Sequence, residues 1–140
     1  MNSTIHDIEI KNMLRMANEA RHRAYVPYSH FRVGACLKSA SGAYYLGANI
    51  ENMSYGVTNC AERTALFKAV YDGERNFEAL LIVSDSPNYT VPCGVCRQAL
   101  SEFCNPGMPV ICANRNGEYR ALTLGDLLPN AFSPEDMKTE

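Results

Sequence analysis

Residues 60–65 read Cys-Ala-Glu-Arg-Thr-Ala and residues 92–98 read Pro-Cys-Gly-Val-Cys-Arg-Gln. Together the two segments supply three thiols and one carboxylate, a set that suits a zinc ion held by three sulfurs with its fourth tetrahedral position left for water. An open position of this kind is typical of catalytic zinc. We therefore predict that Cys60, Cys93 and Cys96 hold zinc and that Glu62, two residues from a ligand, handles the protons of a bound water molecule.

Both segments lie where a loop is predicted to become a helix. One helix opens near Asn59, a good N-cap residue, and stops around Asp72-Gly73, while the next starts at Pro92. The unpaired N–H groups and the positive dipole end of each helix favour thiolate over thiol. Residues two apart on a regular helix point about 200° from each other. Cys60 must therefore occupy an irregular first position if its sulfur is to converge with the Glu62 carboxylate.

The rest of the chain changes between helical and strand periodicity. Apolar residues at helical spacing from position 10 to 24 predict a first helix that ends before Pro27, and Thr123 with Asp126 predicts a capped last helix that ends before Pro129. Alternation, a continuous apolar run and turn signals predict strands at 31–39, 43–49, 79–84, 110–113 and 118–122.

This order of elements predicts an α/β fold. We expect a three-layer α-β-α sandwich in which a mixed sheet of about five strands has helices on both faces. The run at 79–84 lacks clean alternation, which is typical of a strand covered on both sides. With 140 residues and 46% apolar content, the chain fits a single domain spanning residues 1–140.

The composition of the chain indicates which kinds of molecule the protein binds. The net charge is −2 and the 13 Lys and Arg residues are scattered singly, whereas capture of a nucleic-acid backbone needs clustered cations. The longest aliphatic run, residues 79–83, is too short to cross a bilayer, which needs about 20 residues. Residues 1–9 also lack the pattern of a secretory signal. We therefore expect a cytoplasmic protein that binds a small molecule, with no nucleic-acid or membrane partner.

The six cysteines are better interpreted as metal ligands and buried thiols than as three disulfides, because an intracellular compartment is reducing. Cys36 and Cys112 lie in strand patterns and Cys104 lies at the end of a helical pattern. We predict that all three are small core residues.

Three thiolates leave the metal site with a charge of −1, which weakens zinc as an acid. Some group must therefore draw charge from the sulfurs. We hypothesise that Arg63 donates hydrogen bonds to one or two of the ligand sulfurs, with Gln98 as a helper.

The two segments resemble those of the zinc-dependent cytidine deaminases, specifically the small type with three cysteine ligands. Three further segments match that family: Pro-Tyr-Ser-His-Phe-Arg-Val-Gly-Ala at 27–35, Asn-Ile-Glu-Asn at 49–52 and Leu-Leu-Pro-Asn-Ala-Phe at 127–132. The resemblance implies hydrolytic deamination of cytidine and 2'-deoxycytidine to uridine and 2'-deoxyuridine with release of ammonia, as in pyrimidine salvage. It also implies one Zn²⁺ per subunit and a homotetramer whose active sites are shared between subunits.

The resemblance further implies roles for individual residues. Asn49 and Glu51 would hydrogen-bond the ribose hydroxyls, and the main chain near Ala61 and Cys93 would meet the polar edge of the pyrimidine. Phe31 would pack against the pyrimidine or its sugar, and Phe132 of a neighbouring subunit would help to cover the base. Ordinary core packing is the alternative for both aromatic residues. In the reaction, activated water would attack C4 while Glu62 passes a proton to N3 and later to the leaving amine.

Three alternatives stay open at this point. A deaminase of an antibiotic cytosine nucleoside of the blasticidin type shares the cysteine motifs, but we interpret the segments at 27–31 and 49–52 as favouring cytidine. A nucleic-acid-editing deaminase usually has His at the position of Cys60 and needs a basic surface. A non-catalytic zinc-stabilised domain would bind metal and release no ammonia. Residues 53–59 vary within the family, so substrate preference could shift there.

Overall fold

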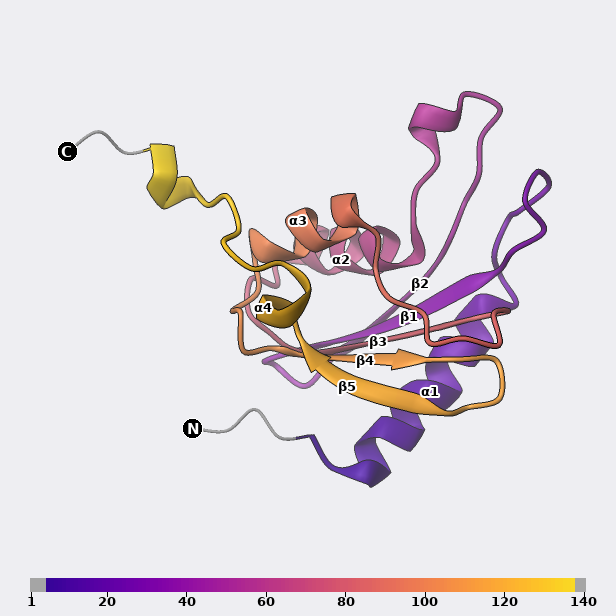
Figure 1. Cartoon of the computed structure of the whole chain (residues 1–140), viewed down its shortest axis with the longest axis horizontal. Helices are drawn as coiled ribbons and strands as arrows, with labels where there is room; N and C mark the ends of the chain where they lie inside the picture. Colours follow the sequence, from indigo (N-terminus) through magenta and orange to yellow (C-terminus); the bar gives the residue numbers. More distant parts are fainter. Residues whose placement is uncertain (1–4, 138–140) are drawn as a thin grey trace.

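The computed structural model describes residues 5–137, and its five strands form one mixed sheet in the order β2-β1-β3-β4-β5 (Figure 1). The strands are β1 Val33–Ser39, β2 Tyr44–Ala48, β3 Phe77–Ser84, β4 Pro109–Ala113 and β5 Tyr119–Thr123. The β3 and β4 strands run parallel, and every other neighbouring pair is antiparallel. The prediction of a mixed sheet of about five strands is therefore confirmed.

Helices cover both faces of this sheet. The helices are α1 Asp7–Arg21, α2 Ala61–Tyr71, α3 Gly94–Ser101 and α4 Leu124–Leu127, with 3₁₀ turns at Tyr55–Val57 and Pro134–Met137. Figure 1 shows α1 on one face and α2 with α3 on the other. Met13 and Ala17 of α1 pack in one core cluster with Leu81, while Leu66 of α2 and Leu100 of α3 pack in the other. The fold is thus a three-layer α-β-α sandwich.

The central strand β3 faces both clusters, as its sequence predicts. Leu80 and Ile82 pack against the α2 and α3 side, whereas Leu81 and Val83 pack against the α1 side. All four side chains have no exposed surface. A strand with apolar groups on both faces needs no polar alternation, which explains the continuous run from residue 79.

Three local predictions are confirmed. Gly42 and Gly117 adopt φ values of +94° and +84° in the two hairpin turns, a conformation that glycine reaches without a Cβ clash. Thr123 and Asp126 form a reciprocal capping box at the start of α4. Cys36, Cys104 and Cys112 are buried free thiols, and burial raises their pKa to about 12, 12 and 11 respectively. No helix between residues 5 and 137 is long and apolar enough to cross a membrane.

Two helix starts differ from the predictions. The N-cap of α2 is Cys60, not Asn59, and the N-cap of α3 is Cys93, so that helix begins after Pro92 rather than at it. Asn59 is held in an extended backbone bridge to Ile50, and its side chain donates to Thr64 Oγ1 at 3.0 Å. Because this bridge keeps residue 59 extended, the helix starts one residue later than the sequence suggests.

One carboxylate ties the end of β3 to α1 and to the segment that enters β1. Asp85 Oδ1 accepts from Arg21 Nη1 and from Arg32 Nη2, both at 3.1 Å, and Asp85 Oδ2 accepts from the Arg32 main chain at 2.9 Å. Burial alone would raise the pKa of Asp85, but the hydrogen bonds from Arg32 and the charges of Arg32 and Arg21 outweigh it and lower that pKa. The carboxylate form is thus stabilised by folding.

Replacing Asp85 by Asn should reduce the free energy of unfolding at neutral pH by about 1–3 kcal/mol, because it weakens hydrogen bonds made to a charged group. A lowered folded-state pKa contributes stability above the unfolded pKa, and that stability is lost as pH falls through the folded pKa. Urea unfolding of the wild-type protein and of Asp85→Asn should therefore show a difference in the free energy of unfolding that becomes smaller below about pH 4. Glu19→Gln, on the exposed face of α1, is the control. A gap that stays constant with pH would contradict this account.

Candidate active site

Backbone bridges bring three distant segments together at one end of the sheet. Ile50, just beyond β2, bridges to Tyr25 on one side and to Asn59 on the other. Figure 1 shows the loop before β1 and the loop before α2 side by side, projecting from the same end of the sheet. Their tips meet where the rings of Tyr28 and Tyr55 pack edge to face with centroids 6.0 Å apart. The start of α2 is therefore placed beside the entry to β1.

The three predicted ligands lie at the starts of α2 and α3. Cys60 and Cys93 are the two N-cap residues, and Cys96 lies in the first turn of α3. Both N-caps have extended backbones, with φ and ψ of −74° and 157° at Cys60, and neither makes a side-chain capping bond. The irregular first position predicted for Cys60 is confirmed. The free N–H groups of both helix starts therefore point toward the region of the sulfurs.

The sulfurs have the spacing that zinc requires. All three Sγ atoms lie within 4.8 Å of one another, and Cys60 Sγ is 3.8 Å from Cys93 Sγ. Two sulfurs bound to one zinc at about 2.3 Å with tetrahedral angles lie about 3.8 Å apart. The residues present thus fit a zinc ion held by three thiolates, and no fourth His, Cys, Asp or Glu joins this group among residues 5–137.

Arg63 lies against the sulfurs, where the sequence predicted it. Arg63 Nη2 donates to Cys60 Sγ at 3.3 Å. Hydrogen bonds from the Cys96 thiol and then from Arg63 lower the pKa of Cys60 to about 5, against the effect of burial. The pKa of Cys96 rises because its proton is the one shared with Cys60 and because it is buried. A cation and two helix starts thus favour negative charge on this cluster.

Glu62 is a buried carboxyl group beside the sulfurs. It lies in the first turn of α2, and only 4% of the residue is exposed. Burial raises the pKa of Glu62 to about 7, and negative charge on Cys60 adds to the shift. A buried ionisable group with so little solvent is costly for folding, and such groups cluster at functional sites.

Close packing fixes the first turn of α2 on the sheet. A Cβ added at Gly47 of β2 would lie 2.3 Å from the main-chain oxygen of Ala61 and 2.6 Å from the nitrogen of Ala65. Only glycine allows the helix backbone to approach the strand this closely. The position of Cys60 and Glu62 therefore depends on the missing side chain at residue 47.

Gly47→Ala should displace the start of α2 and lower the free energy of unfolding by about 1–3 kcal/mol or more, because backbone atoms cannot yield as a flexible side chain can. Zinc affinity should fall as well, since one ligand moves relative to the other two. Urea unfolding and competition with a chelator measure the two effects. Gly56→Ala, where an added Cβ meets nothing within 4 Å, is the matched control. Equal zinc affinity in both variants would contradict the argument.

Asn49 and Glu51 brace the loop that precedes β1. Asn49 Nδ2 donates to the carbonyl of Phe31 at 2.9 Å, and Asn49 Oδ1 accepts from the main chain of Val33 at 2.9 Å. Glu51 Oε1 accepts from the main-chain nitrogens of Tyr28 and Ser29 at 3.0 and 3.1 Å. The pKa of Glu51 is lowered, chiefly by a hydrogen bond from the Ser29 side chain. Both side chains thus hold the segment that carries Phe31.

Glu51 also lines a cavity of about 400 Å³. The other lining residues are Tyr28, Ser29, Tyr55 and Thr58. None of these four residues is among the predicted site residues. Their positions in the sequence gave some indication of a role at the site. Tyr28 and Ser29 belong to the family-like segment at 27–35, and Tyr55 and Thr58 belong to the variable stretch at 53–59.

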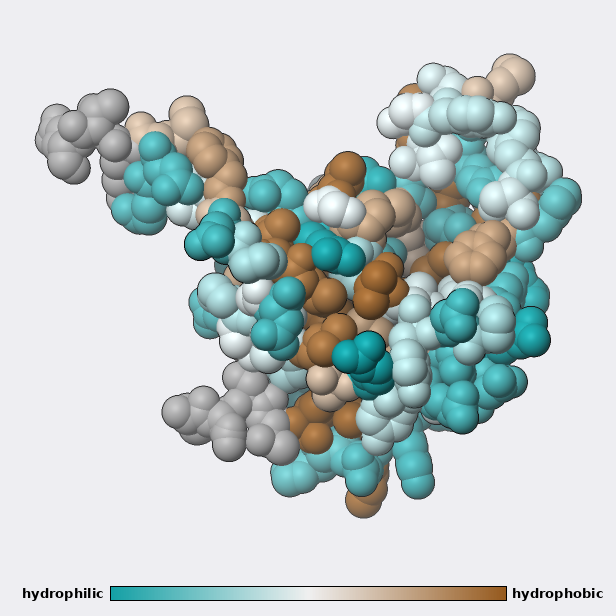
Figure 2. Space-filling model, in the orientation of Figure 1, coloured by the Kyte–Doolittle hydropathy of each residue, from teal (hydrophilic) through white to brown (hydrophobic). Residues whose placement is uncertain are grey.

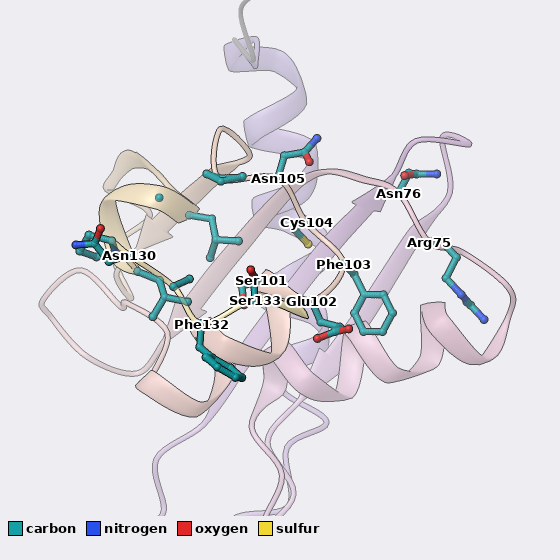
Figure 3. Close-up of a pocket in the computed structure, with 16 residues that line it drawn as sticks. Arg75, Asn76, Ser101, Glu102, Phe103, Cys104, Asn105, Asn130, Phe132 and Ser133 are labelled. Carbon is teal, nitrogen blue, oxygen red and sulfur yellow. The ribbon is translucent and has the colours of Figure 1, made fainter. Parts of the chain in front are cut away.

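The remaining candidate substrate-binding residues differ in how far they are exposed. Ala61 has no exposed surface, and Phe31 is 41% exposed. Phe132 is 60% exposed and lies with Asn130 on one side of a second pocket, of about 720 Å³, opposite Arg75 and Asn76 (Figure 3).

The partner of Gln98 differs from the predicted one. Gln98 Nε2 donates to the carbonyl of Phe132 at 2.9 Å rather than to a ligand sulfur. Its side chain therefore reaches the segment that follows α4, as the side chain of Arg97 does. The prediction that Gln98 helps Arg63 at the sulfurs is therefore corrected.

The arrangement agrees with known proteins. The family model described as the cytidine and deoxycytidylate deaminase zinc-binding region matches residues 8–113. The chain is 50% identical over 130 residues to a cytidine deaminase of Sporosarcina psychrophila, covering 93% of this chain and 96% of that one. It is 49% identical to a cytidine deaminase of Halalkalibacterium halodurans, covering 89% and 95%.

Solved structures give the same answer. A crystal structure of cytidine deaminase from Burkholderia pseudomallei matches with a TM-score of 0.85 and 44% identity, covering 87% of this chain and 98% of that chain. Fold, sulfur geometry and sequence all lead to one conclusion: this chain belongs to the cytidine and deoxycytidylate deaminase family defined by its zinc-binding region.

Proposed function

We propose that the protein catalyses zinc-dependent hydrolytic deamination of cytidine and 2'-deoxycytidine, releasing ammonia and giving uridine and 2'-deoxyuridine. The observation that carries the proposal is the group of three sulfurs with the buried Glu62 at the start of the same helix. A purely structural zinc site would want a fourth sulfur or imidazole ligand. Membership of the deaminase family supports the same reaction.

Each group at the site has a part in this proposal. Cys60, Cys93 and Cys96 would hold one zinc ion per subunit, which supplies a Lewis acid that makes water a better nucleophile near neutral pH. Glu62 accepts the proton of the attacking water, gives it to N3 of the pyrimidine and then helps to protonate the leaving amine. Its burial in the first turn of α2 keeps bulk water from competing for these protons.

Substrate recognition is assigned to the loop that precedes β1 and to the residues that brace it. Asn49 and Glu51 would bind the ribose hydroxyls through the hydrogen-bonding capacity that their bonds to the loop leave free. The two main-chain bonds to Glu51 both use Oε1, which leaves Oε2 as an acceptor, and Asn49 keeps a second amide N–H and a second lone pair on Oδ1. Phe31 would pack against the nucleoside, and its 41% exposure supports this over core packing. The main chain of Ala61 would meet the polar edge of the base.

We also propose a homotetramer with shared sites in the cytoplasm. Exposed apolar side chains gather on the loop before α2 and on the last turns of α2, and Figure 2 shows others in the middle of the face where α3 and α4 lie. Patches of this kind mark interaction sites. Figure 1 shows the segment that carries Phe132 leading away from the sheet, which suits contact with a neighbouring subunit. Three thiol ligands suit a reducing compartment.

The direct test is ultraviolet absorbance of cytidine and 2'-deoxycytidine incubated with the protein before and after chelation, with ammonia measured in parallel. The proposal expects conversion of both nucleosides, loss of conversion after chelation and its return with added zinc. Adenosine serves as the control substrate. Absence of conversion by zinc-loaded protein, or conversion that persists after complete removal of metal, would overturn the proposal.

Replacing Arg63 by Gln should lower kcat about 10-fold or more while zinc content stays similar, since one charge-assisted hydrogen bond to Cys60 is worth about 1.5–3 kcal/mol. With less charge drawn from the sulfur, the bound metal is a weaker acid. Steady-state kinetics and elemental analysis measure the two quantities. Arg15→Gln, an exposed residue of α1, is the control. Unchanged kinetics would end the hypothesis.

A further inference from the structure

Arg97 connects the zinc-ligand loop to the end of α4. Its Nε donates to the carbonyl of Pro92 at 2.7 Å, and its Nη1 donates to the carbonyl of Leu127 at 2.8 Å. Pro92 directly precedes the ligand Cys93, and Leu127 is the last residue of α4. Because a helix leaves its last carbonyls without partners inside the helix, this contact satisfies one of them from α3. One cation therefore joins the two segments.

The next residue of α3 continues the same connection. Gln98 holds the carbonyl of Phe132 at 2.9 Å, five residues beyond Leu127. Between these two points the backbone turns at Asn130, whose φ of 55° lies in the left-handed region. A non-glycine residue keeps this conformation only where its surroundings hold it. Two neighbouring side chains of α3 thus hold both ends of the turn by main-chain oxygens.

These contacts matter because packing within the chain covers Phe132 only in part. Its side chain is 60% exposed, whereas Leu127 packs against the core cluster on the α2 and α3 side. The location of the aromatic ring is therefore set by where the backbone of residues 128–132 runs. Among the described residues, Arg97 and Gln98 donate the side-chain hydrogen bonds that the carbonyls of residues 127–132 accept.

We propose that Arg97 is a positioning residue of the deaminase: it fixes the path of the segment after α4 to the loop that presents Cys93, and so sets where Phe132 lies for substrate binding. The proposal rests on the proposed role of Phe132 in covering the base. A guanidinium can donate to two carbonyls at once from its fixed fork, which a lysine ammonium on a flexible stem does not reproduce. Charge alone is therefore insufficient at this position.

The first experiment follows the ring directly. The chain has no tryptophan, so Phe132→Trp introduces a single fluorescent reporter. In zinc-loaded protein at a fixed concentration, Arg97→Gln and Arg97→Lys should both lower the fluorescence anisotropy of the reporter, while zinc content and the molecular mass in solution stay unchanged. Arg15→Gln should leave the anisotropy as it is. Unchanged anisotropy in both Arg97 variants, or loss of zinc from the Lys variant, would overturn the proposal.

The second experiment separates positioning from any effect on chemistry. Arg97→Gln and Arg97→Lys should raise KM for cytidine about 3- to 10-fold and change kcat by less than about 2-fold, because an interaction that positions a binding group acts on substrate and transition state alike. In a protein that already carries Phe132→Ala, the Arg97 substitutions should cause little additional rise in KM. This is expected if Arg97 acts on substrate binding through Phe132. An equal further rise in that background, or a Phe132→Ala protein with unchanged KM, would refute the assignment.

The two readouts keep this proposal distinct from the proposed function. Wild-type protein that converts neither cytidine nor 2'-deoxycytidine would refute the function, and the anisotropy of the reporter would still decide whether Arg97 holds the segment. Normal deamination with unchanged anisotropy in the Arg97 variants would refute the positioning role alone.

Discussion

Glu62→Gln should lower kcat for cytidine by at least about 10²- to 10⁴-fold, because a single general acid or base contributes about that factor and this carboxyl is proposed to serve several proton transfers. The amide keeps the shape and part of the hydrogen bonding of the carboxyl and cannot accept a proton from water. KM should change little, since no substrate-positioning role is assigned to this side chain. Zinc content should be unchanged.

The effect on stability should have the opposite sign. Glu62 is 4% exposed, and burial raises its pKa to about 7, so the charged form is disfavoured in the fold. A neutral amide removes that penalty, and Glu62→Gln should unfold at the same denaturant concentration as wild type or at a higher one. Glu102→Gln, exposed at the end of α3, is the control. A Glu62→Gln protein that kept more than a tenth of wild-type turnover would contradict the assigned role.

Cys93→Ala should abolish both zinc binding and turnover, and it should destabilise the protein by several kcal/mol. Cys60 begins α2 and Cys93 begins α3, so the metal ties two helix starts together, and binding energy of this kind is folding energy. Cys93 is exposed, so its truncation leaves no buried cavity that could itself destabilise the protein. The loss in free energy of unfolding should therefore come from the lost metal. Elemental analysis, kinetics and urea unfolding measure the three quantities.

Cys36→Ala gives the matched control for this experiment. Cys36 is also a free thiol, but it is buried in the cluster that α1 covers, on the other face of the sheet from α2 and α3. Its loss should cost some stability and leave zinc content and turnover at wild-type levels. If Cys93→Ala behaved like Cys36→Ala, with stoichiometric zinc and normal turnover, the ligand assignment would be wrong.

Much of the fold follows from local patterns. The turns at Gly42 and Gly117, the capping box at Thr123 and the two-sided burial of β3 all result from interactions among near neighbours or from simple periodicity. The order of the strands and the helix starts depend on contacts between distant residues. Asn59 has a strong preference for N-cap positions, but its bridge to Ile50 keeps it extended and gives that position to Cys60.

Some features of the site could likewise be predicted from the sequence, and others depend on contacts between distant residues. The residue types of Cys60, Cys93 and Cys96, with their placement at helix starts, were sufficient to predict the sulfur cluster, and Arg63 lies close enough in sequence to reach it. The contacts of Gln98 and Arg97 could not be predicted, because both side chains reach a segment about thirty positions away in the sequence. The sequence pattern of a short helix does not indicate which distant group a polar side chain will bind. The ribose contacts of Asn49 and Glu51 stay a prediction.

X-ray absorption at the zinc edge of fully active protein tests the central claim most directly. The account predicts one zinc per chain with three sulfurs at about 2.3 Å and one oxygen at about 2.0 Å, the shell of a catalytic site with one position left for water. Addition of a nucleoside that resembles the hydrated intermediate should alter the oxygen contribution and leave the three sulfurs in place. A shell of four sulfurs, or active protein with no stoichiometric zinc, would contradict the account.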